Sequence, residues 1–167
     1  MGKSLIIYFS RAEENYSVGY ITKGNTEIAA EYVKELTGAD MFKVEPLVPY
    51  ASDYRTCTEE ARQRIGHAPI KNNLGSLEAY DVIYVMSPIY WGTFAPEMET
   101  ALMGLDFTGK TIRIITTHEG SGLGNVVSDV SRICKGARVD RKGLAIRGSQ
   151  VKQSRDRIAQ WLRSERR

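Results

Sequence analysis

The sequence predicts an α/β fold of three layers, in which a doubly wound five-stranded parallel sheet is covered by helices on both faces. Two observations carry this prediction. Short apolar runs alternate along the chain with segments of helical periodicity. Several of these runs are apolar throughout, as is typical of strands buried on both faces. The 167 residues contain no internal repeat and no interdomain linker, so we expect residues 1–167 to form a single domain.

The first strand and the first helix are the clearest elements. Residues Ser4–Phe9 form a continuous apolar run, and an amphipathic helix follows from about Thr26 to Thr37. Gly38 can end that helix, because glycine readily adopts the left-handed conformation common at helix C-termini. A second strand, Met41–Glu45, ends before Pro46, which has no N–H to donate to a sheet.

The middle of the chain continues the alternation. A second helix is predicted by residues that share one face, namely Tyr54, Cys57, Ala61 and Ile65. Residues 66–75 are polar and rich in Asn, Gly and Pro, so they are expected to form a loop. The third strand, Val82–Ser87, is apolar throughout, and Pro96 suits the first turn of a third helix.

The last third contains two more strands and two more helices. The fourth strand is Thr111–Thr116, a fifth lies within Val139–Ile146, and a last helix runs from about Val151 to Arg163. The fourth helix carries its apolar residues on one side, at Leu123, Val126, Val127, Val130 and Cys134. In a doubly wound sheet ligands bind beyond the carboxyl ends of the strands. The loops after strands one, three and four are therefore the candidate binding loops.

Composition excludes several classes of function. The formal net charge is +3, from 23 basic and 20 acidic residues, which is too small to indicate nucleic-acid binding. No apolar run approaches the roughly 20 residues that span a bilayer. The two cysteines and two histidines have no metal-ligand spacing, so no metal is expected. The first nine residues are better interpreted as a buried strand than as a secretion leader, and we expect a cytoplasmic protein with reduced thiols.

The loop after the first strand is typical of a phosphate-binding site. Ser10 ends the strand, and Gly24-Asn25-Thr26-Glu27 opens the first helix, whose N-terminus offers unpaired N–H groups to an anion. There is neither a GxxxxGK[ST] motif nor a GxGxxG motif, so a nucleoside triphosphate or a dinucleotide is not indicated. A single phosphate held mostly by neutral donors fits better. The alternative is an ordinary strand–turn–helix junction in which Asn25 only caps the helix.

Two further loops add an aromatic and a glycine-rich element. The loop after strand three, Pro88–Thr93, places Tyr90 and Trp91 beside Gly92, and aromatic faces can stack on a planar ligand. The loop after strand four, Thr117–Gly124, contains three glycines, which let the backbone approach a heterocycle closely. Each loop alone has a simpler explanation, namely side-chain packing or a flexible connector. Together with the phosphate loop they indicate a flat ring system with one phosphate arm, a description that FMN meets.

Three motifs, IIYFS…GNTE, SPIYWG and THEGSGLGN, resemble those of the flavodoxin-like family over essentially the whole chain. The resemblance implies the strand order 2-1-3-4-5, FMN as cofactor, and a subgroup with an insert in the phosphate loop, here Arg11–Lys23. It assigns no catalytic residue. By the resemblance the phosphate is held by Ser10, Arg11, Asn25 and Thr26, the ring lies along Pro88, Ile89, Tyr90, Trp91 and Gly92, and its pyrimidine side is bordered by Thr117, His118, Glu119, Gly120, Ser121, Gly122 and Gly124.

The resemblance implies electron transfer by bound FMN, with redox proteins, or small quinone or nicotinamide substrates, as partners. Small electron-carrier flavodoxins are strongly acidic as a family, and the +3 balance of this chain departs from that habit. An NAD(P)H-dependent FMN or quinone reductase therefore remains an alternative, as does a non-catalytic FMN-binding module. A receiver-like regulator is disfavoured, because strand one ends in Tyr8-Phe9-Ser10 rather than in acidic residues. We expect a monomer or a homodimer that binds neither nucleic acid nor membrane.

Overall fold

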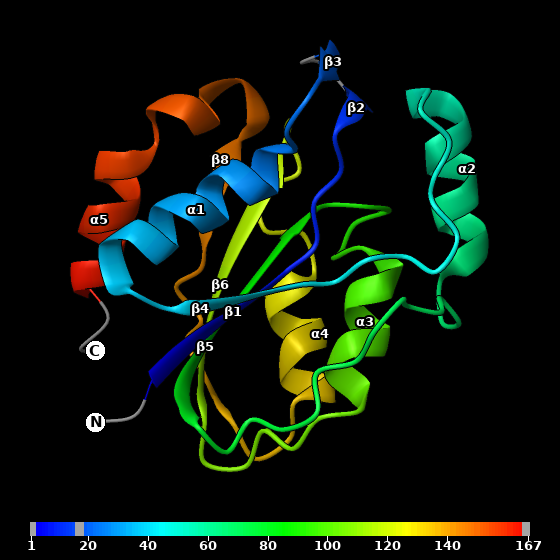
Figure 1. The fold of residues 1–167 in the computed structure, drawn as a ribbon. Helices are drawn as coiled ribbons and strands as arrows, with labels where there is room; N and C mark the ends of the chain where they lie inside the picture. The colour runs from blue at the N-terminus through cyan, green and yellow to red at the C-terminus, as the bar shows by residue number, and fades with distance from the viewer. Residues whose placement is uncertain (1–2, 16–18, 165–167) are drawn as a thin grey trace.

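The computed structural model describes residues 3–15 and 19–164, and within them six strands form one parallel sheet (Figure 1). Across the sheet the order is β4-β1-β5-β6, with β7 and β8 both paired to β6. The strands are β1 (Lys3–Tyr8), β4 (Asp40–Lys43), β5 (Tyr80–Pro88), β6 (Thr111–His118), β7 (Arg138–Val139) and β8 (Leu144–Arg147). Because β7 and β8 together take the place of the fifth strand, the predicted order 2-1-3-4-5 is confirmed.

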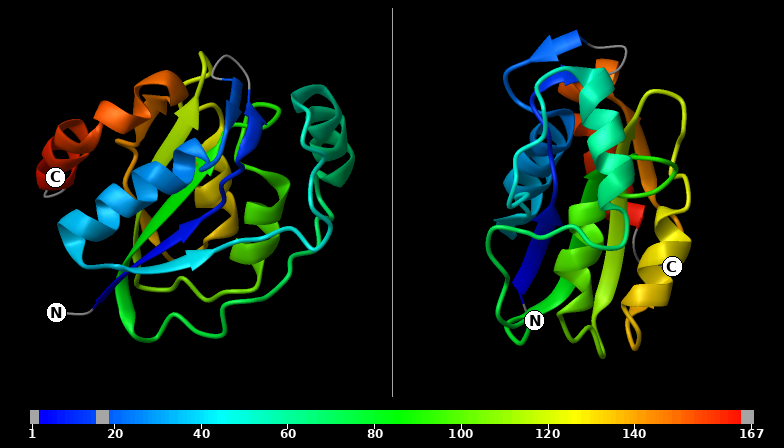
Figure 2. Two further views of the ribbon diagram at one scale, coloured as in Figure 1. Left: turned by 45° about the horizontal axis from the view of Figure 1, so that its top comes forward. Right: turned by 90° about the vertical axis from the view of Figure 1, so that its right-hand side faces the viewer.

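Helices cover both faces of this sheet, as the two further views show (Figure 2). One face carries α1 (Asn25–Thr37) and α5 (Arg155–Arg163), and the other carries α3 (Pro96–Met103) and α4 (Val126–Ile133). The remaining helix, α2 (Tyr54–Arg64), packs beside α3 and extends past the sheet. The three-layer architecture expected from the alternation of apolar runs and helices is therefore present.

Two hydrophobic cores lie on opposite sides of the sheet, and β1 contributes to both of them from Leu5 onward. Leu5 and Ile7 belong to the core under α3 and α4, whereas Ile6 and Tyr8 belong to the core under α1 and α5. Successive side chains of a strand point to opposite faces, so a strand covered on both sides must be apolar at every position.

The predicted fifth strand is divided in two, which the sequence did not indicate. Asp140 ends β7, because its carboxylate accepts a hydrogen bond from the Lys142 N–H and so forms a local turn. Residues 140–143 separate the two pieces. The last helix is also interrupted: a 3₁₀ helix, η1 (Gly148–Gln153), precedes α5, and Ser154 lies between them.

Other boundaries differ by one to three residues, as is usual at element ends. Cys57 and Ala61 form the buried face of α2, but Ile65 lies beyond its last residue and is half exposed. The insert contains a short antiparallel pair, β2 (Glu13–Asn15) and β3 (Gly19–Ile21), and its residues 16–18 lie outside the described residues. No helix in the described part of the chain is both long and apolar enough to cross a membrane.

Candidate functional site

A cavity of about 450 Å³ opens at the carboxyl ends of β1, β5 and β6. This position is the topological switch point of the sheet. The chain runs from β1 to β4 on one side of β1 and then crosses to β5 on the other side. The predicted site residues that line it are Arg11, Asn25, Thr26, Pro88, Ile89, Tyr90, Trp91, Gly92, Thr117, His118, Glu119 and Ser121. The other four, Ser10, Gly120, Gly122 and Gly124, belong to the same loops but are not among the lining residues.

Ser10 caps the first helix from a distance in sequence. Its Oγ accepts a hydrogen bond from the N–H of Glu27 at 3.0 Å, whereas the N-cap residue Gly24 offers no side chain. Asn25 is the first residue of α1 and makes no capping bond, so the simple interpretation of Asn25 as the cap is wrong. A Cβ on Gly24 would collide with the Ser10 hydroxyl and lie 2.8 Å from the Arg11 backbone nitrogen. The loop therefore requires glycine at this position.

A buried hydrogen bond joins the first and third loops of the cavity. The hydroxyl oxygens of Thr26 and Thr117 lie 2.7 Å apart, and both residues are buried. Thr26 belongs to the first turn of α1, and Thr117 is the penultimate residue of β6. The helix N-terminus is thus fixed relative to the carboxyl end of the sheet.

Arg11 is buried and connects the insert to the segment that leads into α2. Its NH2 group donates to the backbone oxygens of Ala51 at 2.8 Å and Ser52 at 2.6 Å. Charged donors give stronger hydrogen bonds than neutral ones. Arg11 therefore holds the 51–52 segment against the wall of the cavity while also lining it.

The aromatic loop is a tight turn. Tyr90 and Thr93 exchange backbone hydrogen bonds of 2.7 and 3.3 Å, and the two residues between them have positive φ angles, 54° at Trp91 and 87° at Gly92. Glycine adopts such angles without strain, but a tryptophan rarely does. The indole nitrogen of Trp91 donates to the Thr58 backbone oxygen at 2.8 Å, which fixes the ring against α2 while half of it remains exposed.

Tyr90 extends the site into an aromatic cluster. Its ring packs edge-on against Phe9 at 5.8 Å and Tyr50 at 6.2 Å between centroids. Burial is the main cause that raises the pKa of the Tyr90 hydroxyl well above 10, so the phenol stays protonated at neutral pH. This wall of the cavity is therefore aromatic and uncharged.

The glycine-rich loop is held to the aromatic loop by the backbone. The Gly92 oxygen accepts a hydrogen bond from the Asn125 N–H at 2.8 Å, and a Cβ on Gly124 would collide with that same oxygen. His118 Nδ1 accepts the N–H of Gly120 at 2.8 Å. Burial, followed by the charge of Arg147, lowers the pKa of His118 below 6.5.

Glu119 places a carboxylate close to the first helix. Its Oε2 is buried and has no hydrogen-bond partner among the described residues. A Cβ on Gly148 would collide with this oxygen and with the side-chain nitrogen of Asn25. Asn25, Glu119 and Gly148 thus pack tightly beside the helix N-terminus, and the orphaned oxygen marks this corner as a place where a ligand donor would be accommodated.

Sequence reasoning missed the contribution of α2, which lines the cavity with Tyr54, Cys57, Thr58 and Ala61. Small side chains at Cys57 and Ala61, four residues apart on the inner face, are the only sequence signal that this face leaves space. Burial raises the pKa of the Cys57 thiol, so it is a neutral wall residue.

A buried ion pair fixes the end of α2. Arg64 donates to the fully buried Glu97 of α3 at 3.1 Å, and the Tyr50 hydroxyl donates to the same carboxylate at 2.9 Å. The Arg64 guanidinium also lies 3.9 Å from the centre of the Tyr50 ring. No group of three His, Cys, Asp or Glu within the described residues could hold a metal ion.

The chain is similar to known flavoproteins. The flavodoxin family model matches residues 15–165. A structure named as a flavoprotein from Bacteroides uniformis is 25% identical with a TM-score of 0.76, covering 98% of this chain and 99% of that one. Two more distant structures show the same fold: a flavoprotein in complex with FMN from Lactobacillus acidophilus (20% identity, TM-score 0.62, coverage 92% and 98%) and the Fusobacterium nucleatum flavodoxin bound to FMN (16%, 0.57, 98% and 96%). No curated protein matches the chain.

Proposed function

The chain belongs to the flavodoxin family, and on this premise we propose that it binds FMN in the cavity at the carboxyl edge and transfers electrons. The observation that carries the proposal is the meeting of three loops around one cavity. These loops follow β1, β5 and β6, and they offer a helix N-terminus, two aromatic side chains and a glycine-rich backbone. A volume of about 450 Å³ lies within the range of sites that bury small ligands.

The residues at one end of the cavity suit a phosphate group. Asn25 and Thr26 line the cavity at the N-terminus of α1, where backbone N–H groups and the helix dipole favour an anion. Ser10 and Thr26 have hydroxyls there, although each already makes a hydrogen bond within the protein. These donors are neutral, as expected for one phosphate group rather than a chain of phosphates.

The residues at the other end suit a planar ring. Pro88, Ile89 and Tyr90 supply an apolar wall, and Trp91 stands at the mouth of the cavity against α2. Aromatic walls exclude water and stack on planar rings. Thr117, His118, Glu119 and Ser121 line the cavity from the loop after β6, and in this proposal backbone groups of that loop would hydrogen-bond the edge of the heterocycle.

FMN would supply the redox chemistry when bound, and the protein would bind it, orient it and tune it. Tyr90 and Cys57 are neutral, so the positive charge that a bound ring would meet beside them comes from Arg11, which also lines the cavity. The electron partner is a redox protein in this proposal. The two cysteines are free and buried, which agrees with the cytoplasmic location that we propose.

The direct test is the visible spectrum of the purified protein mixed with FMN and followed through stepwise chemical reduction. We expect a yellow protein that retains one FMN per chain on gel filtration and is reduced in two resolvable one-electron steps. A protein that stays colourless in excess FMN would contradict the proposal at its first step. Tight FMN binding with a single two-electron step would contradict the electron-carrier role.

An NAD(P)H-dependent reductase is the second candidate function, and the extent of the cavity lining supports it. The lining extends from the aromatic loop to Tyr54, Thr58 and Ala61 of α2, which leaves a wall beyond the ring-binding residues. A nicotinamide or a small quinone could occupy that space. Under anaerobic conditions, NADPH alone would bleach the bound flavin of a reductase within seconds, whereas an electron carrier would stay oxidised until its partner reductase was added.

A further inference from the structure

Charge is strongly segregated along the chain. Residues 132–167 contain twelve basic and three acidic residues, whereas residues 1–131 contain eleven basic and seventeen acidic ones. The net charges of the two parts are therefore +9 and −6, and the formal +3 of the whole chain conceals this difference. Such an asymmetry creates a local field much larger than the net charge suggests.

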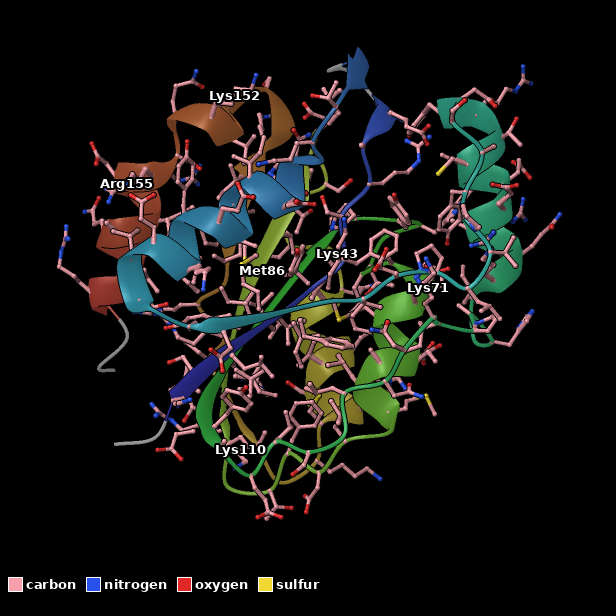
Figure 3. All side chains as sticks on the ribbon, viewed as in Figure 1. Lys43, Lys71, Met86, Lys110, Lys152 and Arg155 are labelled. Atoms are coloured by element: carbon pink, nitrogen blue, oxygen red, sulfur yellow. The ribbon has the colours of Figure 1, made fainter. Side chains whose placement is uncertain are left out.

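The fold places the basic segment along one side of the molecule. The segment forms β7 and β8, which pair only with β6 at the border of the sheet, followed by η1 and α5. Figure 3 shows Lys152 on η1 and Arg155 on α5, well away from Lys71 and Lys110. In the described part of this segment seven exposed basic residues have no ion pair. Five of them, which lie around β8, η1 and the start of α5, are here called the basic face: Arg141, Lys142, Arg147, Lys152 and Arg157.

The basic face is continuous with the cavity. Arg147 ends β8 and is the register neighbour of His118, which lines the cavity from the end of β6. The next residue, Gly148, packs directly against Asn25 and Glu119 of the cavity wall. The charges of Arg147 and Arg157 also contribute, after burial, to the lowered pKa of His118. A partner held on this face would therefore lie beside the ligand-binding edge.

The character of the face favours a protein over a bilayer or a nucleic acid. Large exposed hydrophobic side chains, which would enter a bilayer, all lie outside this segment in the described residues: Leu47, Val48, Tyr54, Ile65, Trp91 and Met103. The segment also lacks an exposed aromatic residue on which a base could stack, because its tryptophan, Trp161, is buried. A protein partner with an acidic surface would need neither exposed apolar side chains nor an exposed aromatic ring on this face.

We propose that the basic face docks the acidic surface of a redox partner protein and holds it beside the cavity. The inference rests on the proposed electron-transfer function. Clustered positive charges would steer a partner rich in Asp and Glu and orient it toward the cavity edge. Screening should weaken this attraction, since the Debye length shortens from about 30 Å at 0.01 M salt to about 8 Å at 0.15 M.

The test uses two small redox proteins as probes, an acidic plant-type [2Fe–2S] ferredoxin and the basic cytochrome c. Affinities are measured by titration calorimetry with both the FMN-free and the FMN-loaded protein. We expect the ferredoxin to bind at about 20 mM NaCl and its affinity to fall at least about tenfold at 200 mM, because several charge pairs are screened. Cytochrome c should not bind measurably on this face.

Charge reversal identifies the surface. The variant Lys152→Glu with Arg157→Glu should weaken ferredoxin binding at low salt by about tenfold or more. The matched control, Lys71→Glu with Lys110→Glu, changes the net charge equally but elsewhere, and its affinity should stay within about twofold. Equal losses in the two variants would overturn the proposal, since only net charge would then matter. Tighter binding of duplex DNA or of anionic vesicles than of ferredoxin would also overturn it.

The outcome remains informative if the proposed function fails. A protein that does not bind FMN refutes the electron-transfer proposal, yet ferredoxin binding to the FMN-free protein still reports on the basic face. Conversely, normal FMN binding without any ferredoxin affinity refutes the docking proposal alone. An unfolding temperature equal to that of the unsubstituted protein shows that each of the two double variants is folded.

Discussion

The hydroxyls of Thr26 and Thr117 form a buried hydrogen bond of 2.7 Å that connects the first turn of α1 to the end of β6. Residues 91 positions apart in sequence thus meet in the lining of the cavity. Both residues are buried, and the bond between them is the hydrogen bond that each hydroxyl makes within the described residues.

A double-mutant cycle tests this hydrogen bond. Thr26→Val or Thr117→Val alone should lower the free energy of unfolding by about 1–3 kcal/mol, because a buried hydroxyl loses its partner. The double variant should cost clearly less than the sum of the two, with a coupling of about 1 kcal/mol. Urea unfolding gives these values. Additive effects would show that the two hydroxyls act independently, and Thr26→Ser serves as the control that keeps the bond.

Ser10→Ala should destabilise the protein by about 1 kcal/mol, because the Glu27 N–H at the start of α1 loses its acceptor. The same change removes a hydroxyl from the phosphate end of the proposed site, so FMN affinity should fall as well. Calorimetric titration with FMN and chemical denaturation measure the two effects separately. Ser76→Ala, in the loop before β5, is a matched control that should leave FMN affinity unchanged.

Gly148→Ala should weaken FMN binding through the phosphate end of the cavity. The new methyl group would collide with the Asn25 amide and the Glu119 carboxylate, so both side chains must shift. FMN affinity should fall by about tenfold, and riboflavin, which lacks the phosphate, should lose less affinity, because only the shift of Glu119 would affect its ring. Fluorescence titration with both flavins provides the comparison, and Ser149→Ala is the neighbouring control. An equal loss for the two flavins would show that the change acts on the ring site or on the fold.

Glu97 and Arg64 allow a test of how α2 is fixed. Glu97→Gln should cost about 3 kcal/mol, since Arg64 is then left partly buried without its counter-charge. Replacing both residues by methionine should be milder than either single change, because no uncompensated charge remains. Thermal and urea unfolding report the stability. A double variant less stable than both singles would show that the ion pair itself stabilises the fold.

The fold could be predicted because its strands are buried on both faces. Runs such as Val82–Met86 have no charged residue and no alternation of polar and apolar positions, and this pattern identifies a strand that is covered on both faces. The order of the loops around the cavity followed from the alternation of strands and helices. The break at Asp140 was not visible, because a single Asx turn within an apolar stretch has no periodic signal.

The sequence predicted those parts of the site that follow directly on a strand, but not those that depend on contacts between distant segments. The loops after β1, β5 and β6 were found because each follows directly on an apolar strand. The contacts of Arg11 with Ala51 and Ser52 span about 40 residues, and those of Trp91 with Thr58 span 33. Such contacts depend on how α2 packs in three dimensions. They explain why the wall formed by α2 was missed.

His118 should make the stability of the protein depend on pH in the mildly acidic range. Burial and the charge of Arg147 hold its pKa below 6.5, so the unfolded chain binds a proton more readily than the folded protein does. The contribution of His118 to the free energy of unfolding is therefore fully present above pH 6.5. It should be lost as the pH falls from 6.5 through the lower pKa of the folded state. The effect should be small, because His118 is only partly buried. Urea unfolding midpoints between about pH 7.5 and 5 measure this effect. His118→Gln should flatten the pH profile in that range. Arg147→Gln should reduce the decline without abolishing it, because burial is the larger cause of the lowered pKa. An unchanged profile in His118→Gln would assign the pH dependence to other groups.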